Sequence, residues 1–119
     1  MKRPKAPEKL NYSIGLRTMW VFVMFDLPTT TPAHIKAYTK YRKGLLKDGF
    51  SMMQYSVYYR HCASTEQADV HINRMQEGVP DEGEIRFLTI TDTQFGKMKI
   101  VRGKMRDEPP PTPAQLEFF

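Results

Sequence analysis

Cysteine is nearly absent from this sequence, since Cys62 is the only one among 119 residues. A single cysteine cannot form an internal disulfide, and it excludes every zinc site that needs four cysteines. Long apolar runs are also absent, because the longest, Met19–Phe25, is far shorter than the roughly 20 residues that cross a membrane. We therefore expect a protein of the cytoplasm that carries neither a secretory signal nor a membrane anchor.

The motifs of several common enzyme sites are missing too. The chain has no glycine-rich phosphate loop, no G-x-S-x-G and no C-x-x-C. Its three histidines, His34, His61 and His71, are spread over different predicted elements and do not form a metal-ligand set. Charge is then the strongest functional signal that remains.

Positive charge is abundant and unevenly distributed. Residues 1–60 carry eleven Lys and Arg residues against three acids, whereas residues 61–119 carry seven against ten acids. The two halves therefore have net charges of +8 and −3. Such asymmetry indicates a polyanionic partner, most simply a nucleic acid, although charge that only keeps a surface soluble explains the same count.

Composition divides the chain into three parts. Residues 1–17 form a basic arm, residues 18–104 form one domain, and residues 105–119 form a proline-rich tail. The end of the tail fits either a docking peptide for a partner or a frayed terminus. Its apolar residues are Leu116, Phe118 and Phe119.

Hydrophobic periodicity predicts an α+β domain. Helices are expected after Thr30 or Thr31 and after Ser64, which are suitable N-caps. The order β-α-β-β-α-β is that of the ferredoxin-like fold, an antiparallel sheet with both helices on one face. An extra strand, Met98–Val101, follows this unit, and we expect it to pair with a second copy of the chain because exposed edge strands invite pairing. The other strands are expected at residues 19–25, 50–54, 56–62 and 84–91.

Asp26 is the main candidate for chemistry, because it ends the most apolar strand of the chain. A turn aspartate that accepts bonds from backbone N–H groups of Leu27–Thr29 explains it without a function. A functional interpretation needs a second carboxylate or a cation, and a two-fold dimer supplies the second carboxylate from the other protomer. Mg²⁺ suits such a pair, since it keeps several waters and takes only one or two carboxylates.

Four lysines of the first predicted helix follow a spacing that places them along one face. They are Lys36, Lys40, Lys43 and Lys47. A solvated face explains such a row, but a phosphate backbone relieves its mutual repulsion. No base-reading motif accompanies it, so binding would follow the backbone and shape of the nucleic acid. Arg17 and Arg60 extend this candidate nucleic-acid-binding surface.

Several short segments occur in a fixed order between residues 18 and 104. The segments are Val21–Pro28, Gly49–Phe50, Met53–Tyr58, Ile85–Ile90, Thr93–Phe95 and Ile100–Val101. Together they resemble the small CRISPR-associated endoribonuclease family, the second CRISPR adaptation protein. The Phe-Asp-Leu-Pro and Gln-Tyr-Ser-Val stretches are most similar to the versions from type II CRISPR systems.

The resemblance implies a ferredoxin-like homodimer whose last strand joins the partner's sheet. It implies that Asp26 of each protomer is the catalytic Mg²⁺ ligand, and that Ser56 and Tyr58 lie near the dimer cleft. Two functions follow from it. One is a scaffold that binds double-stranded DNA and bridges two dimers of the CRISPR integrase during spacer acquisition. The other is a metal-dependent endonuclease that cleaves RNA or DNA.

The residues themselves favour the scaffold. One carboxylate per chain, with no general base beside it in the sequence, is a sparse site for phosphodiester cleavage. A basic helix, a basic arm and an apolar tail suffice for a scaffold. A third interpretation, a small-molecule-binding regulatory domain of the same fold, stays open as an alternative.

Overall fold

The computed structural model describes residues 18–104. The predicted arm and tail, with Arg17 in the one and Leu116, Phe118 and Phe119 in the other, lie outside the described residues. Within the described range, no helix is both long and apolar enough to cross a membrane.

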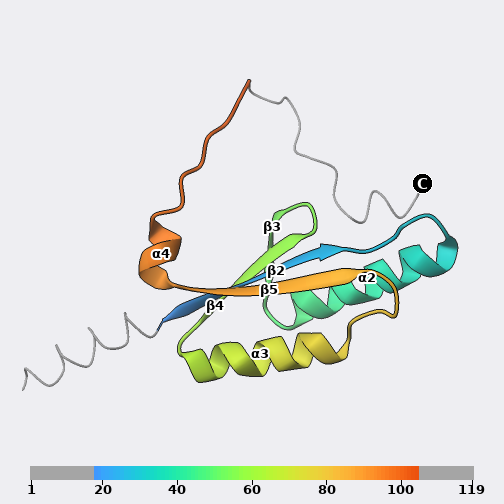
Figure 1. Cartoon of the computed structure of the whole chain (residues 1–119), viewed down its shortest axis with the longest axis horizontal. Coiled ribbons are helices and arrows are strands. Elements are labelled where there is room, and N and C mark those ends of the chain that lie inside the picture. Colours follow the sequence, from blue (N-terminus) through green and yellow to red (C-terminus); the bar gives the residue numbers. More distant parts are fainter. Residues whose placement is uncertain (1–17, 105–119) are drawn as a thin grey trace, which may run out of the picture.

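Four antiparallel strands form one sheet in the order β3-β4-β2-β5 (Figure 1). β2 pairs with β4 on one side and with β5 on the other. This strand order, with the first strand in the interior of the sheet, is that of the ferredoxin-like fold and confirms the predicted architecture. The strands are β2 (Met19–Asp26), β3 (Ser51–Gln54), β4 (Val57–Cys62) and β5 (Glu84–Thr91).

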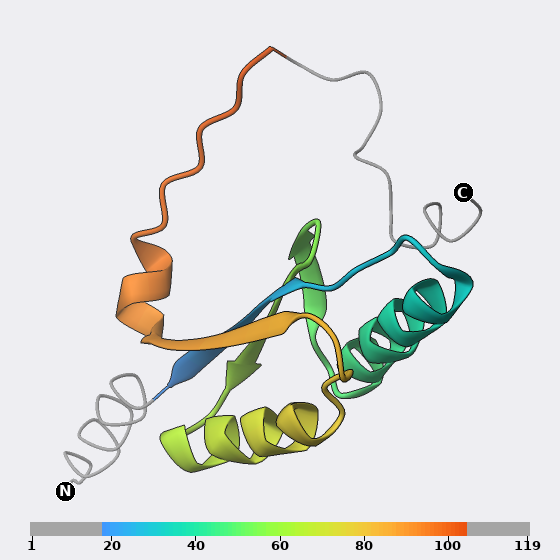
Figure 2. The same ribbon diagram turned by 45° about the vertical axis from the view of Figure 1, so that its right-hand side comes forward.

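Two helices, α2 (Pro32–Lys47) and α3 (Thr65–Glu77), cover the same face of the sheet (Figure 2). The predicted caps are confirmed at both. The Thr31 hydroxyl accepts a hydrogen bond from the His34 backbone N–H at 3.1 Å, and the Ser64 hydroxyl accepts one from Gln67 at the same distance. Each cap satisfies one of the free N–H groups at a helix start.

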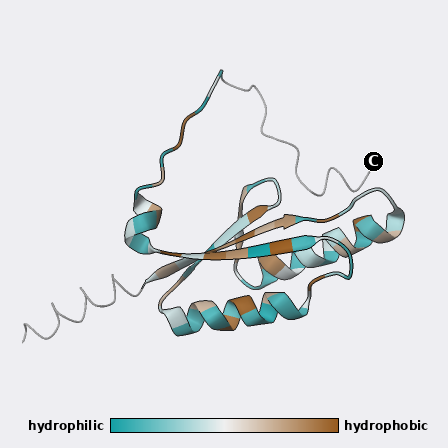
Figure 3. Cartoon of the chain, viewed as in Figure 1, coloured by the Kyte–Doolittle hydropathy of each residue, from teal (hydrophilic) through white to brown (hydrophobic). Residues whose placement is uncertain are grey.

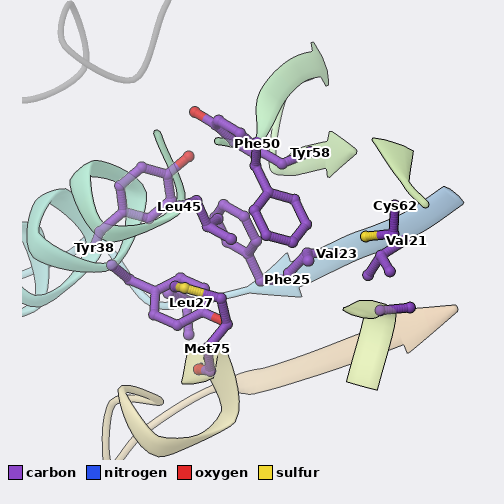
Figure 4. Packing of buried hydrophobic residues seen from close by; sticks show 12 residues of the cluster. Val21, Val23, Phe25, Leu27, Tyr38, Leu45, Phe50, Tyr58, Cys62 and Met75 are labelled. Atoms are coloured by element: carbon purple, nitrogen blue, oxygen red, sulfur yellow. The ribbon is translucent and has the colours of Figure 1, made fainter. Parts of the chain in front are cut away.

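The hydrophobic core lies between the sheet and these two helices. Alternation along β2 directs Val21, Val23 and Phe25 toward the helices, where all three are buried. Leu45 of α2 and Tyr58 of β4 are fully buried in the same cluster (Figure 4). The opposite face of the sheet is covered by neither α2 nor α3 (Figures 1 and 2).

The C-terminal part of the described chain differs from the prediction. Residues Asp92–Gly96 form a short helix, α4, where no helix was expected. Met98–Val101 forms no strand within residues 18–104, because it lies alongside none of the strands in that range. It is extended, exposed and partly apolar, as the brown stretch beyond α4 shows (Figure 3). Its pairing with a second copy stays a prediction.

Candidate metal and nucleic-acid sites

Asp26 lies on the open face of the sheet. It follows Trp20, Phe22 and Met24 at alternate positions of β2, so it shares the face that α2 and α3 leave uncovered. The residue is exposed and is the last of the strand. A carboxylate in this place is accessible to a cation or to a second copy of the same strand end.

The Asp26 carboxylate makes no hydrogen bond and no ion pair with any residue between 18 and 104. The turn interpretation predicts bonds from backbone N–H groups in the turn 27–29, where Leu27 and Thr29 carry such groups and Pro28 does not, and neither donates to Asp26 in the described chain. The geometry therefore does not support a purely structural role as a turn aspartate.

The residue directly across the sheet from Asp26 is a second acid, Glu84. The two residues are Cα partners in the β2–β5 ladder. Like charges at such positions are unfavourable, and the Arg86 guanidinium, 2.8 Å from the Glu84 carboxylate, offsets part of the repulsion. Sequence reasoning missed Glu84 because 58 residues separate it from Asp26; only the register of the two strands brings them together.

Gly83 allows the chain to pass close to Asp26. Its φ of +106° lies in the left-handed region, and a Cβ atom at this position would stand 2.9 Å from the Asp26 carbonyl oxygen. The same Cβ would stand 2.5 Å from Leu27 Cδ2. A side chain at residue 83 would therefore displace the end of β2 and with it the candidate metal ligand.

The donor set at this end of the sheet fits magnesium. Asp26 and Glu84 offer only carboxylate oxygens, which hard divalent cations prefer. The described part of one chain contains no group of three or more His, Cys, Asp or Glu side chains that could hold a metal. A magnesium ion at Asp26 would thus complete its shell with waters or with groups from a second chain.

A hollow of about 170 Å³ adjoins the strand end, between Leu27, Pro28 and the start of α2. His34 lines it with both ring nitrogens engaged. Nδ1 lies 3.2 Å from the Thr30 hydroxyl, and Nε2 lies 2.9 Å from the Glu82 carboxylate. These contacts attach the start of α2 to the loop before β5, so His34 has a structural role that the sequence did not indicate.

The predicted lysine row is present on α2. Lys36, Lys40, Lys43 and Lys47 are all exposed, and α2 contains no acidic residue. Their spacing gathers the four ammonium groups along one side of the helix. This surface, called the lysine face below, is a row of like charge on one side of the helix, and its contact with a phosphate backbone stays a prediction.

Arg60 is engaged with the backbone of its own chain. Its Nε donates to the Asp48 carbonyl at 2.9 Å, and its Nη1 donates to the His61 carbonyl at 2.6 Å. Arg60 thus supports the C-terminal end of α2. Hydrogen bonds to neutral carbonyl oxygens do not cancel the positive charge of Arg60. Its contribution to nucleic-acid binding stays a prediction.

Ser56 and Tyr58 have different surroundings, the first in a turn and the second in the core. Ser56 adopts a positive φ of 61° in the β3–β4 turn, and its carbonyl accepts a bond from the Phe25 N–H at 3.1 Å, beside the end of β2. The Tyr58 side chain instead points into the core and stacks on Phe25 with ring centroids 5.7 Å apart. Burial raises the pKa of Tyr58. The Ser56 hydroxyl lies 3.2 Å from the Tyr38 hydroxyl of α2, so the Ser56 and Tyr58 side chains are both turned toward the helices, and their place near a dimer cleft stays a prediction.

A polar cluster, buried at Asp48 and His71 and half exposed at Arg74, joins the two large helices. The Asp48 carboxylate, at the C-cap of α2, lies 2.7 Å from His71 Nδ1 and also pairs with the Arg74 guanidinium of α3. The Asp48 and His71 side chains are both nearly inaccessible to solvent. The sequence showed no sign of this cluster, because its members come from separate helices.

These features define a small ferredoxin-like domain with a free carboxylate at the end of its first strand and a basic helix face. Residues 19–98 match the family model described as CRISPR associated protein Cas2. The chain therefore belongs to the Cas2 family, which confirms the resemblance drawn from the motifs.

Curated relatives agree with this assignment, and a solved structure shares the fold. The chain is 60% identical over 101 residues to the "CRISPR-associated endoribonuclease Cas2" of Parvibaculum lavamentivorans, a match that covers 85% of this chain and all of that protein. It is 47% identical over 103 residues to the protein of the same name from Flavobacterium psychrophilum, covering 87% and 90% of the two chains. A solved structure, "Crystal structure of cas2", shares the fold, with a TM-score of 0.54 at 17% identity over 80% of this chain and 97% of the other.

Proposed function

We propose that this chain is a dimeric, double-stranded-DNA-binding scaffold of CRISPR adaptation, in which one dimer bridges two dimers of the CRISPR integrase during spacer acquisition. The lysine face of α2 is the observation that carries the proposal, because four exposed ammonium groups line a helix without a single acid. Duplex phosphates relieve the repulsion within such a row. The family of the chain supports the CRISPR context.

Binding by the lysine face would follow the duplex backbone and not the base sequence. Double-stranded DNA is the proposed ligand, with RNA as the alternative nucleic acid. Arg17, which lies outside the described residues, and Arg60 would add further positive charge to the contact. The proposed anchors for the integrase are the apolar residues of the tail, Leu116, Phe118 and Phe119, which also lie outside the described residues.

The homodimer is supported by apolar surface that one chain leaves uncovered. On the open face Leu88 is 49% exposed, and beyond α4 the side chains of Ile100 and Val101 are largely in solvent. β5 is the more suitable edge for an added strand, because it has eight residues in regular register. β3, at the other edge, has only four residues and an irregularity between Met52 and Gln54, and short or bulged edges resist pairing.

Magnesium is the proposed cofactor, held by Asp26 and by the same residue of the second protomer. The free and exposed state of the Asp26 carboxylate in the described chain supports this assignment. A bound magnesium ion would stabilise phosphate charge and lower the pKa of a coordinated water. Asp26 would bind and orient the ion, while Gly83 keeps the strand end in the place where the carboxylate is accessible.

The second candidate function is metal-dependent cleavage of RNA or DNA. It is favoured by the same carboxylate and by the name "endoribonuclease" that the relatives carry. Against it stands the sparse set of groups around Asp26. Within residues 18–104 no histidine or lysine is hydrogen-bonded to it, and the nearby His34 has both ring nitrogens engaged elsewhere. The scaffold is therefore the first proposal.

Asp26→Asn separates the two functions, because a neutral amide has the same size but binds Mg²⁺ poorly. We expect spacer integration with the partner integrase to survive this change, and any magnesium-dependent cleavage to be lost. In the absence of metal the variant should dimerise more tightly, since two facing carboxylates no longer repel each other. Asp69→Asn, an exposed acid on α3, is the control for the altered net charge.

Spacer integration by Asp26→Asn is also the measurement that can contradict the scaffold proposal. Loss of integration in Asp26→Asn, with duplex binding and dimerisation intact, would make cleavage the main role and the scaffold secondary. The binding and dimerisation assays are part of the design because a variant that no longer binds DNA would lose integration for a different reason.

A further inference from the structure

Helix α4 is attached to the open face of the sheet by the only tryptophan of the chain. Trp20 Nε1 donates a hydrogen bond to the Asp92 carboxylate at 2.7 Å. Its indole stacks on Phe95 with ring centroids 3.8 Å apart and an interplanar angle of 8°. A stacked aromatic pair and a charge-assisted hydrogen bond at one residue make a specific attachment for a helix of five residues.

This attachment turns the chain toward the interior of the sheet. The Phe95 ring lies 6.0 Å from that of Phe22 in β2 and 5.9 Å from that of Tyr59 in β4. β5 is the edge strand, and β2 and β4 are the second and third strands from that edge. Helix α4 therefore carries the chain inward over β2, away from the free edge of the strand that it follows.

The residues beyond α4 have no partner surface in the described chain. Residues 98–104 run away from the sheet in both views (Figures 1 and 2). The exposed fractions are 39% for Met98, 68% for Ile100 and 79% for Val101. Three large apolar side chains within four residues rarely stay in water without a purpose.

Chain length alone does not keep this segment away from its own sheet. Six residues, 92–97, lie between the end of β5 and Met98. Antiparallel neighbours are commonly joined by two to five residues, so six would suffice for the segment to return along the free edge of β5. The attachment of α4 to Trp20 is what directs the chain elsewhere.

We propose that Trp20, Asp92 and Phe95 form a latch that keeps residues 98–101 off their own β5 and leaves them free to pair with β5 of a second copy of the chain. The α4 latch thus decides between a closed monomer with a five-stranded sheet and a dimer with an exchanged strand. This inference rests on the homodimer of the proposed function and adds to it the residues that favour exchange over closure.

Two variants release the latch in different ways. Phe95→Ala removes the stack, and Asp92→Ala removes the hydrogen bond to the indole. Thr93→Ala is the matched control, because Thr93 is exposed on the same helix and makes no contact recorded in the described chain. Emission from Trp20, the only tryptophan, reports directly whether α4 has left the indole in each variant.

Two measurements on the full chain test the proposal. Sedimentation equilibrium gives the dimer dissociation constant, which should rise about tenfold or more in both latch variants and stay unchanged in Thr93→Ala. Hydrogen exchange at concentrations far below that constant follows the backbone amides of residues 98–101. They should exchange rapidly in the unmodified monomer and become protected in the latch variants, as the segment closes onto its own β5.

Each outcome separates the latch from the homodimer. If the unmodified chain dimerises and the latch variants dimerise equally well, the latch is wrong while the homodimer stands. If the unmodified chain stays monomeric at every concentration, the homodimer is wrong, and hydrogen exchange alone decides about the latch. Protection that appears only in Phe95→Ala and Asp92→Ala supports it, and amides that exchange equally fast in all four proteins contradict it.

Discussion

Helices α2 and α3 contribute similarly to the hydrophobic core but present opposite charge to the solvent. Both pack on one face of the sheet and both bury three residues, among them Leu45 of α2 and Met75 of α3. The exposed side of α2 carries four lysines and no acid. The exposed side of α3 carries Glu66, Asp69 and Glu77, and its one arginine, Arg74, is paired with Asp48.

The comparison shows that packing does not determine this difference. Surface charge at positions of equal burial is free to vary without affecting the fold, so a single-sign row on only one helix calls for an explanation outside the core. A polyanion would be attracted to α2 and repelled by α3. The domain therefore has one basic side and one acidic side.

The largest effect is expected when the surface charge of each helix is reversed in turn. With Lys36, Lys40, Lys43 and Lys47 all changed to Glu, duplex affinity should fall by about a hundredfold or more, because several phosphate contacts per dimer are lost. The slope of log affinity against log salt, about −5 for six contacts, should become much shallower. Titration of a labelled duplex at several salt concentrations measures both.

The mirror-image variant is the control. Changing Glu66, Asp69 and Glu77 to Lys alters the net charge by a similar amount in the opposite sense, and it should change duplex affinity much less than the α2 variant does. A gain in affinity from this variant as large as the loss from the α2 variant would show that net charge, and not the lysine face, determines binding. A sharp preference for one base sequence would contradict contact through the backbone alone.

The link between the two helices is the next test. Asp48→Ala removes the carboxylate shared by His71 and Arg74 and leaves a nearly buried imidazole without its partner. The free energy of unfolding should fall by about 2 kcal/mol, because the buried imidazole loses its hydrogen-bond partner while the half-exposed arginine is still solvated. Urea denaturation followed by circular dichroism measures the change.

Asp69→Ala provides the matched comparison for that experiment. Asp69 is an exposed acid of α3 that takes no part in the cluster, so its loss should change stability by no more than about 0.5 kcal/mol. A similar small effect from Asp48→Ala would mean that the apolar contacts of α2 and α3 hold the helices in place without the polar cluster.

The parts of the fold that follow local rules were predictable from sequence. The apolar run that became β2, the caps Thr31 and Ser64, and the boundaries of β5 depend on neighbours within a few residues. Helix α4 was not predictable, since five residues are too few to show an apolar period. Met98–Val101 has the composition of a strand, but a strand also needs a partner edge, and composition does not supply one.

The residues of the candidate site likewise fall into those with a local sequence pattern and those brought together only by the fold. Asp26 and the lysine face stand out in the sequence, because an acid after an apolar run and four like charges at helical spacing are local patterns. Glu84, His34 and the Asp48 cluster depend on contacts between residues 23 to 58 positions apart. That the Tyr58 side chain enters the core follows only from the register of β4, while its place near a dimer cleft stays a prediction of the resemblance.

Two buried tyrosines give the smallest expected effects. Burial raises the pKa of both Tyr41 and Tyr58 above the ordinary value for tyrosine. The folded chain then keeps these protons at a pH where the unfolded chain has lost them. Their contribution to stability is complete below a pH of about 10 and is lost as the pH rises toward the raised values.

The two tyrosines differ in the bond that each hydroxyl makes. The Tyr41 hydroxyl of α2 donates to the Met75 carbonyl of α3 at 3.2 Å. The buried Tyr58 hydroxyl instead lies beside the Arg42 guanidinium, but neither that hydroxyl nor Arg42 Nε has a partner at normal hydrogen-bond geometry among residues 18–104. Tyr41→Phe should therefore lower the free energy of unfolding at neutral pH by about 1 kcal/mol, and Tyr58→Phe should leave it unchanged or raise it slightly. Both variants should lose less stability than the unmodified chain between pH 9 and 11, a range that brackets the ordinary tyrosine pKa of about 10. The urea concentration at the unfolding midpoint, measured for all three proteins across that pH range, tests these expectations. A large loss from Tyr58→Phe at neutral pH would show that its hydroxyl does bond to the Arg42 guanidinium beside it.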